Sequence, residues 1–174
     1  MYYPTYKIIV FGDKGVGKSS LMEGYTTHLS DSTLNIGVDF CLKTLIVDDK
    51  KVKLQVWVFR VGERFRFLLS TYVKAAKGGI FMYDITNYSS LAHIDDWLAL
   101  IKKEIDKLFP IIVVGNKGDL SEEREVSAEE GINIAKSRDL DAFIECSCKT
   151  GENVEEVFKT LTRLMLQRWG IILN

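Results

Sequence analysis

Short, nearly continuous runs of apolar residues punctuate the chain, and they predict buried strands. Runs of this kind are typical of strands that are covered on both faces of a mostly parallel sheet. The segments 38–47 and 52–59 are also rich in β-branched and aromatic residues, and the sequence Asp48-Asp49-Lys50 predicts a hairpin turn between them. The continuous runs lie at 7–11, 79–84, 111–114 and 142–146.

Between the strands, apolar residues recur every three or four positions, a spacing that predicts amphipathic helices. Pro110 is expected to end the longest of them, because proline cannot continue a helix. Ser127 followed by Glu130 is a capping-box pattern and predicts a helix that runs to about Arg138. The other predicted helix faces are Leu21, Met22, Tyr25 and Leu29; Leu91, Ile94, Leu98, Ile101, Ile105 and Leu108; and Val154, Val157, Phe158, Leu161, Leu164 and Met165.

This alternation of strands and helices predicts an α/β fold, a doubly wound, mostly parallel six-stranded sheet with helices on both faces. In such a sheet, functional sites lie at the carboxyl ends of the strands. The length of 174 residues predicts a single domain, 1–174. With 23 Lys and Arg against 24 Asp and Glu, the net charge of −1 favours no nucleic-acid partner.

Cysteine content and hydropathy bear on the cellular compartment. The three cysteines, Cys41, Cys146 and Cys148, are too few for a disulfide framework and favour a reducing interior. No apolar stretch approaches the roughly 18 residues that span a bilayer, and the N-terminal segment lacks the features of a signal peptide. We therefore expect a cytoplasmic protein.

The first predicted strand ends in the sequence GDKGVGKS at 12–19, which matches the phosphate loop G-x-x-x-x-G-K-[ST] with a strand before it and a helix after it. Glycines let the backbone N–H groups of such a loop turn inward around phosphates, and the helix adds a partial positive charge. We expect Lys18 to be a catalytic cation at the β- and γ-phosphates and Ser19 to bind Mg²⁺. The predicted phosphate-binding residues are Asp13, Lys14, Gly15, Val16, Gly17, Lys18, Ser19 and Ser20.

Two later loops suggest which base is bound. After the strand at 111–114 comes an N-K-x-D sequence whose carboxylate, Asp119, can accept hydrogen bonds from the ring N–H and exocyclic amine of guanine; adenine offers an acceptor instead. The sequence N-K-x-D alone also fits an ordinary exposed loop. Backbone amides after the last strand can donate to the guanine carbonyl, and the two thiols there, Cys146 and Cys148, are too few for a metal site. The predicted base-binding residues are Asn116, Lys117, Asp119, Ser147, Cys148 and Lys149.

Beyond these loops, the chain resembles the Ras superfamily of small GTPases, and most closely its Rab branch, from about Tyr6 to Arg168. The resemblance implies the G-domain fold of P-loop NTPases, a GTP/GDP switch with Mg²⁺, and a role in signal transduction or vesicle transport. It also implies that effectors or regulators bind the two switches and an aromatic cluster of Phe40, Trp57 and Tyr72; packing of the sheet edge is the alternative explanation for these aromatics. The Rab-type segments are IGVDF at 36–40, KLQVW at 53–57, RFRFL at 64–68, YVKAA at 72–76 and MYDIT at 82–86.

The second switch departs from the family pattern, which has an aspartate, a glycine and a glutamine before E-R-F. Aligned on Glu63, this chain has Val58, Val61 and Gly62 at those positions; shifted by one residue, it has Phe59, Gly62 and Glu63. Neither alignment supplies the carboxylate that holds a Mg²⁺-bound water. The position that orients the attacking water falls either to Gly62, which has no side chain, or to Glu63. We therefore expect weak hydrolysis.

Further departures concern the first switch, the phosphate loop and the C-terminus. Asn35 occupies the position of the family's Mg²⁺-binding threonine, and its amide oxygen or Thr33 is available as a ligand. Lys14 replaces a residue that is small in most relatives, so it either crowds an incoming arginine finger or supplies charge to the γ-phosphate. The sequence ends without a C-terminal cysteine, so we expect no prenyl anchor in it and at most indirect membrane contact; a truncated tail or an unlipidated relative, such as a prokaryotic Rab-like protein, would each explain this. We also expect a monomer.

Three functional hypotheses follow. The first is a Rab-like small GTPase with weak intrinsic hydrolysis. The second is a pseudo-GTPase, a GTP-binding interaction module that has lost hydrolysis. The third, an ATP-dependent kinase, is disfavoured by the N-K-x-D sequence. His28 and His93 are assigned no function and are expected to be surface or packing residues.

Overall fold

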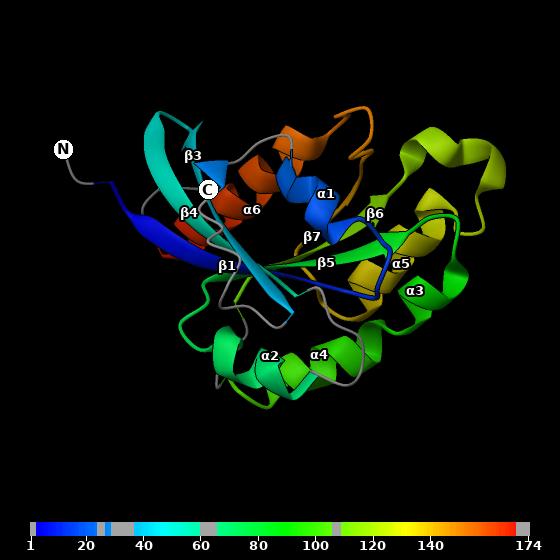
Figure 1. The fold of residues 1–174 in the computed structure, drawn as a ribbon, viewed down its shortest axis with the longest axis horizontal. Coiled ribbons are helices and arrows are strands. Elements are labelled where there is room, and N and C mark those ends of the chain that lie inside the picture. Colours follow the sequence, from blue (N-terminus) through cyan, green and yellow to red (C-terminus); the bar gives the residue numbers. More distant parts are fainter. Residues whose placement is uncertain (1–2, 24–26, 29–36, 60–65, 106–108, 170–174) are drawn as a thin grey trace.

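A single twisted sheet runs through the protein between two layers of helices in the computed structural model (Figure 1). The structure describes residues 3–23, 27–28, 37–59, 66–105 and 109–169. Within them, the strands are β1 (Thr5–Phe11), β2 (Thr27–His28), β3 (Val38–Val47), β4 (Lys50–Phe59), β5 (Gly78–Asp84), β6 (Ile111–Asn116) and β7 (Ala142–Glu145).

The strand order is β2-β3-β4-β1-β5-β6-β7. β3 pairs antiparallel with β2 and β4, and all other neighbouring strands in this order are parallel. The carboxyl ends of β1, β5, β6 and β7 therefore meet at one rim of the sheet, where ligands bind in folds of this class.

The helices divide between the two faces of the sheet, and two buried apolar clusters fill the space beneath them (Figure 1). Along β1, Ile8 and Val10 belong to the cluster under α1 and α6, whereas Ile9 and Phe11 belong to the cluster under the other helices, as the two-residue period of a strand requires. The first face carries α1 (Lys18–Glu23) and α6 (Val154–Arg168), and the second carries α2 (Arg66–Val73), α3 (Tyr88–Ala92), α4 (Ile94–Lys102) and α5 (Ala128–Ser137). No helix in the described ranges has the length and apolar character that crossing a bilayer requires.

The predicted fold is confirmed. The six predicted strands are β1 and β3 to β7, and the two-residue β2 extends the same sheet at its edge. The predicted hairpin joins β3 to β4 through Asp48 (φ 47°) and Asp49 (φ 62°), a left-handed pair of the kind that two-residue hairpin turns need. The predicted capping box opens α5: the Glu130 amide donates to the Ser127 hydroxyl, and the Ser127 amide donates to the Glu130 carboxylate.

Two predicted helices were too long. The helix expected from Leu91 through Leu108 is, in its described part, two helices, α3 and α4, separated at His93, and α4 ends at Lys102. The helix expected after the phosphate loop, α1, is described from Lys18 to Glu23, and it cannot extend to Leu29 because Thr27–His28 form β2. Apolar spacing continues past both ends and does not mark them. The starts of α3 and α4 do have local signals: Asn87 caps α3, and Asp95 and Asp96 provide negative charge in the first turn of α4. The positions Tyr25, Leu29 and Leu108 lie outside the described residues.

Candidate functional site

The phosphate loop, 12–19, connects the end of β1 to α1 and is pressed against the neighbouring strands. Gly12 has φ +142°, and a Cβ built there would lie 2.1 Å from the Met82 carbonyl oxygen on β5. Gly17 has φ +103°, and its Cβ would lie 2.1 Å from Asn116 Nδ2 at the end of β6. Only glycine fits these two positions, because both the backbone conformation and the close contact exclude a side chain.

Lys18 turns back across this loop. Its side chain is buried, and Nζ donates hydrogen bonds to the carbonyl oxygens of Gly12 (2.7 Å) and Asp13 (2.6 Å). Burial lowers the pKa of Lys18 to about 8, and the negative charge of Asp13 opposes that shift. A polyphosphate in the loop would give this ammonium a charged partner in place of two neutral carbonyls.

Nucleotide binding is therefore expected to take up a proton in alkaline solution. Phosphate oxygens at Nζ would raise the Lys18 pKa in the complex above its value of about 8 in the free protein. Between the two pKa values the complex holds the extra proton, so affinity falls as the pH rises above about 8. We expect an uptake of about 0.9 proton at pH 9 and about 0.1 proton at pH 7, measured by titration calorimetry in buffers of different ionisation enthalpy. A Lys18→Arg variant stays charged at both pH values, so an equal uptake by that variant would assign the proton to another group.

Asn116, at the end of β6, forms hydrogen bonds that connect its own loop to the phosphate loop and to the loop after β7. Its side chain is 2% exposed, and Nδ2 donates to the Val16 carbonyl oxygen of the phosphate loop (2.8 Å). Oδ1 accepts from the backbone N–H of Cys148 (3.0 Å) and from the Cys146 thiol (3.6 Å) in the loop after β7. The Cys148 amide, expected to donate to the guanine carbonyl, is thus already bonded to Asn116. A purine carbonyl would have to share that amide or take the next one.

The Asp119 carboxylate is held by a hydrogen bond from a buried side chain. It belongs to the 3₁₀ helix Gly118–Glu123, and its Oδ1 accepts a 2.7 Å hydrogen bond from the hydroxyl of Ser147, which is fully buried. The Ser147 hydroxyl also accepts from the Thr150 backbone N–H (3.1 Å). Ser147 thus fixes the orientation of the Asp119 carboxylate from the protein interior. Asp119 itself is exposed and lines the larger pocket.

Lys117 spans the pocket from a left-handed backbone conformation (φ 68°, ψ 35°). Its Nζ lies 2.6 Å from Oδ2 of Asp84, at the end of β5. Burial raises the pKa of Asp84, but hydrogen bonds from Lys117 and Thr86 outweigh it and bring the pKa below its usual value. This ion pair holds the Lys117 stem extended in the pocket wall, which is the position that contact with a base face requires.

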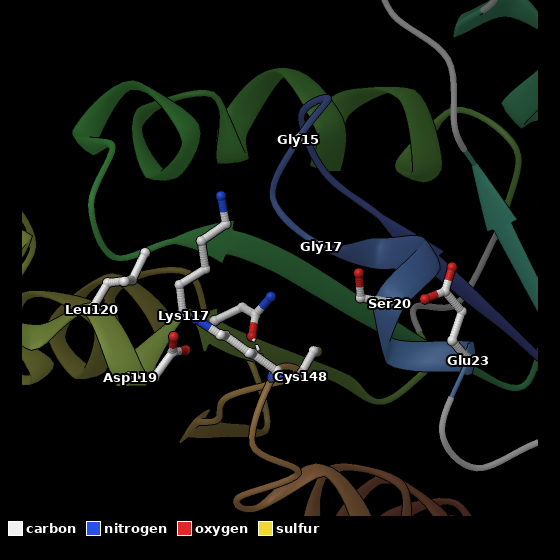
Figure 2. A pocket seen from close by; sticks show the side chains of 10 residues that line it. Gly15, Gly17, Ser20, Glu23, Lys117, Asp119, Leu120 and Cys148 are labelled. Carbon is white, nitrogen blue, oxygen red and sulfur yellow. Dashed lines mark hydrogen bonds between the residues drawn. The ribbon is translucent and has the colours of Figure 1, made fainter.

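These residues enclose two pockets that share Gly15, Gly17 and Ser20 (Figure 2). The larger, about 690 Å³, holds the base-binding candidates, and the smaller, about 330 Å³, follows the phosphate loop. In Figure 2, Lys117 and Asp119 lie across the larger pocket from Ser20 and Glu23. The predicted residues that line one or both pockets are Lys14, Gly15, Gly17, Lys18, Ser19, Ser20, Asn116, Lys117, Asp119, Cys148 and Lys149.

Three predicted contact residues, Asp13, Val16 and Ser147, do not line the pockets and support them instead. The Val16 side chain is in the core while its carbonyl bonds to Asn116. The Asp13 carboxylate points away from the loop: it contacts His93 Nδ1 (2.5 Å) and accepts from Trp97 Nε1 (2.9 Å). His93, which sequence analysis left unassigned, thus helps to fix the phosphate loop to α4. The four-residue spacing of His93 and Trp97 places them on one side of the start of α4, but it does not identify Asp13 as their partner.

Leu120 and Glu23 also line the larger pocket, although no motif in the sequence indicated them. Leu120 follows the predicted Asp119 directly, and Glu23 is the last residue of α1. Conversely, five residues of the predicted switches, Thr33, Asn35, Val61, Gly62 and Glu63, lie outside the described part of the chain.

At the end of β4, the structure places Val58 on the phosphate-loop side of the sheet. Val58 is fully buried in the apolar cluster that contains Val16 and Leu21, whereas Phe59 belongs to the cluster on the opposite face. Of the two residues that the alignments place at the family's aspartate, Val58 therefore lies on the phosphate-loop side of the sheet and Phe59 on the other side. No group of three or more His, Cys, Asp or Glu side chains suited to a metal occurs among the described residues.

The three aromatic residues form one cluster on the face of α2. Ring centroids lie 4.9 Å apart for Phe40 and Trp57 and 5.2 Å apart for Trp57 and Tyr72. Phe59 joins through Tyr72 at 5.8 Å, and Lys7 Nζ lies 4.9 Å from the Trp57 ring centroid. The cluster predicted from sequence is present, and all three of its members are partly exposed.

Comparison with known proteins agrees with this geometry. The sequence model of the Ras family matches residues 7–167. Ras-related protein Rab-1 of Theileria parva is 42% identical over 167 residues, which are 94% of this chain and 76% of that protein. Ras-related protein Rab-4 of Dictyostelium discoideum is 40% identical over 164 residues (93% and 80%), and GTP-binding protein ypt3 of Schizosaccharomyces pombe is 39% identical over 162 residues (92% and 75%). The chain therefore belongs to the Ras family, as a Rab-like small GTPase with a guanine-nucleotide-binding switch domain.

Proposed function

We propose that this protein binds GTP and GDP in the two adjacent pockets and hydrolyses GTP slowly. The observation that carries the binding proposal is this adjacency: the phosphate loop and a carboxylate supported by Ser147 line neighbouring pockets that share Gly15, Gly17 and Ser20. The observation that carries the slow rate is Val58, an apolar side chain at the loop face of β4.

Different described residues would contact the phosphates and the base of the nucleotide. Lys18 and the backbone amides of the phosphate loop would hold the β- and γ-phosphates and stabilise the charge that develops on the γ-phosphoryl group as water attacks in line and the bond to GDP breaks. Asp119 would accept from the two guanine donors, and the Lys117 stem would cover the base. Asn116 would keep both regions in place through Val16 and Cys148.

Mg²⁺ in such a site is held largely by the nucleotide's own phosphate oxygens. The hydroxyl of Ser19 lines the smaller pocket and fits a direct ligand, and Asn35 is the proposed second protein ligand. Bound there, the ion would neutralise phosphate charge. Val58 cannot accept hydrogen bonds from the ion's waters, so the protein's hold on Mg²⁺ is expected to be weaker than with a carboxylate.

The pseudo-GTPase is the second candidate function, and the same observation at Val58 favours it. A single-turnover assay of GTP-loaded protein separates the two. Slow release of phosphate that depends on Lys18 supports the GTPase, and complete retention of GTP supports the interaction module. In either case Phe40, Trp57 and Tyr72 are the proposed contact for effectors or regulators.

The purified protein is expected to carry guanine nucleotide. Denaturing the protein and separating the released compounds by ion-exchange chromatography should yield GDP or GTP in near-stoichiometric amount, because Asp119 discriminates between the purines. Recovery of adenine nucleotides alone would contradict the proposal. Repeating the extraction after treatment with a chelator measures how far retention depends on Mg²⁺.

A further inference from the structure

Two cysteines, Cys146 and Cys148, lie on either side of Ser147 in the loop after β7, and Cys148 lines the larger pocket. Cys146 is 2% exposed, while Cys148 is partly exposed and lines the pocket (Figure 2). Cys146 Sγ donates to Asn116 Oδ1 (3.6 Å), and the Cys148 backbone N–H donates to the same oxygen (3.0 Å), so both residues lie beside Asn116, where the two thiols interact. Ser147 between them directs its hydroxyl to Asp119 instead.

The two thiols differ in access and in acidity. The interaction with the neighbouring Cys146 thiol lowers the pKa of Cys148, and this effect outweighs the burial of Cys148, which acts in the opposite direction. The same interaction, together with burial, raises the pKa of Cys146. Thiolates rather than thiols are the reactive form, so Cys148 has both the better access and the higher reactivity.

We propose that Cys148 is a modification site for small hydroperoxides, that Cys146 is its resolving thiol, and that the disulfide between them weakens nucleotide binding. The last of these consequences rests on the function proposed above. The modification itself rests only on the thiol pair and on the opening of Cys148 to the pocket.

The reaction balances with the hydroperoxide as the sole oxidant. The Cys148 thiolate attacks the terminal peroxide oxygen, the O–O bond breaks, and the oxygen of the leaving group takes a proton to become water or an alcohol. Cys148 is thereby oxidised by two electrons to a sulfenic acid. The Cys146 sulfur then attacks the Cys148 sulfur, the S–O bond breaks, and hydroxide leaves as water with the Cys146 proton.

The consequence for the pocket follows from Asn116. Its Oδ1 accepts from both the Cys146 thiol and the Cys148 backbone N–H, and its Nδ2 holds Val16 in the phosphate loop. A disulfide removes the thiol donor and draws the Cys148 side chain toward Cys146, which displaces the loop that carries Lys149. Conversely, a purine bound in the pocket would cover Cys148 and should protect it from oxidation.

The test is oxidation of the full chain by hydrogen peroxide, with and without GDP, followed by mass spectrometry of its cysteine peptides. We expect the Cys146–Cys148 peptide to lose two hydrogens in protein freed of nucleotide. With GDP at 100 times its Kd, the reaction should be about 100-fold slower, because only about 1% of sites stay open. In Cys146→Ala, oxidation should stop at a Cys148 sulfenic acid that a 1,3-diketone traps, and in Cys148→Ala the Cys146 peptide should remain reduced.

Cys41, buried in β3, is the internal reference thiol. Oxidation of Cys148 no faster than that of Cys41 in nucleotide-free protein would overturn the modification site. If the disulfide forms but leaves the release rate of a fluorescent GDP analogue unchanged, the coupling to the pocket is wrong. If oxidation accelerates release of the analogue and dithiothreitol returns the release rate to its original value, the coupling is supported. A protein that binds no GDP in its reduced form refutes the proposed function instead, and the comparison of Cys148 with Cys41 still decides the modification site.

Discussion

Replacing Asp119 by alanine is expected to lower affinity for GDP by a factor on the order of 100 or more, while the weak affinity for ADP changes little. The carboxylate is the group proposed to accept two hydrogen bonds from guanine, and each hydrogen bond to a charged group contributes about 1.5–3 kcal/mol. Adenine lacks the exocyclic amine at that position and gains nothing from the carboxylate. Competition of GDP and ADP against a fluorescent nucleotide measures both affinities.

Two variants of neighbouring residues make this result specific. Glu122→Ala removes an exposed carboxylate from the same 3₁₀ helix and should leave both affinities unchanged. Ser147→Ala removes the hydroxyl that fixes Asp119 from behind, so it should weaken GDP binding less than Asp119→Ala does. A guanine preference that survives Asp119→Ala intact would show that the base is recognised elsewhere, and the proposed orientation of the nucleotide would be wrong.

Much of the fold was predictable because its signals are local. The Ser127–Glu130 capping box and the two-residue turn at Asp48 and Asp49 are complete within four residues of sequence, and both appear as predicted. The run 111–114 is apolar at every position, and it forms the buried strand β6 next to β5. Helix ends were less predictable. Apolar residues continue at helical spacing beyond Lys102, although α4 ends there.

The site was predictable as a list of residues but not as a set of contacts. Each of its three loops has a sequence motif, and parallel strands bring those motifs to one rim. The bond between Asn116 and Val16 joins residues 100 positions apart, and that between Trp97 and Asp13 joins residues 84 positions apart. No local pattern encodes such pairs, so the supporting roles of Asp13, Val16 and Ser147 became visible only in the structure.

Restoring a carboxylate with Val58→Asp is expected to make both stability and hydrolysis depend on Mg²⁺. Val58 is fully buried and pairs directly with Asp39 on β3, so an aspartate there would share a face with a second carboxylate. Without Mg²⁺, burying that charge should lower the melting temperature by roughly 5–10 °C, since about 2–4 °C is lost per kcal/mol in a domain of this size. With Mg²⁺ and nucleotide, the carboxylate can accept hydrogen bonds from metal-bound water, and most of the loss should be recovered.

The same variant should raise the single-turnover rate of GTP hydrolysis by a factor on the order of 10, equivalent to about 1.4 kcal/mol of transition-state stabilisation. Val58→Asn is the matched control, because it introduces a polar side chain of nearly the same size as aspartate without the charge. It should be destabilised as well, but its melting temperature and rate should respond to Mg²⁺ no more than those of the parent protein. If Val58→Asp gains neither rate nor Mg²⁺ dependence while it still binds GTP, the slow step lies elsewhere, and the water-orienting position at Gly62 or Glu63 becomes the residue to change next.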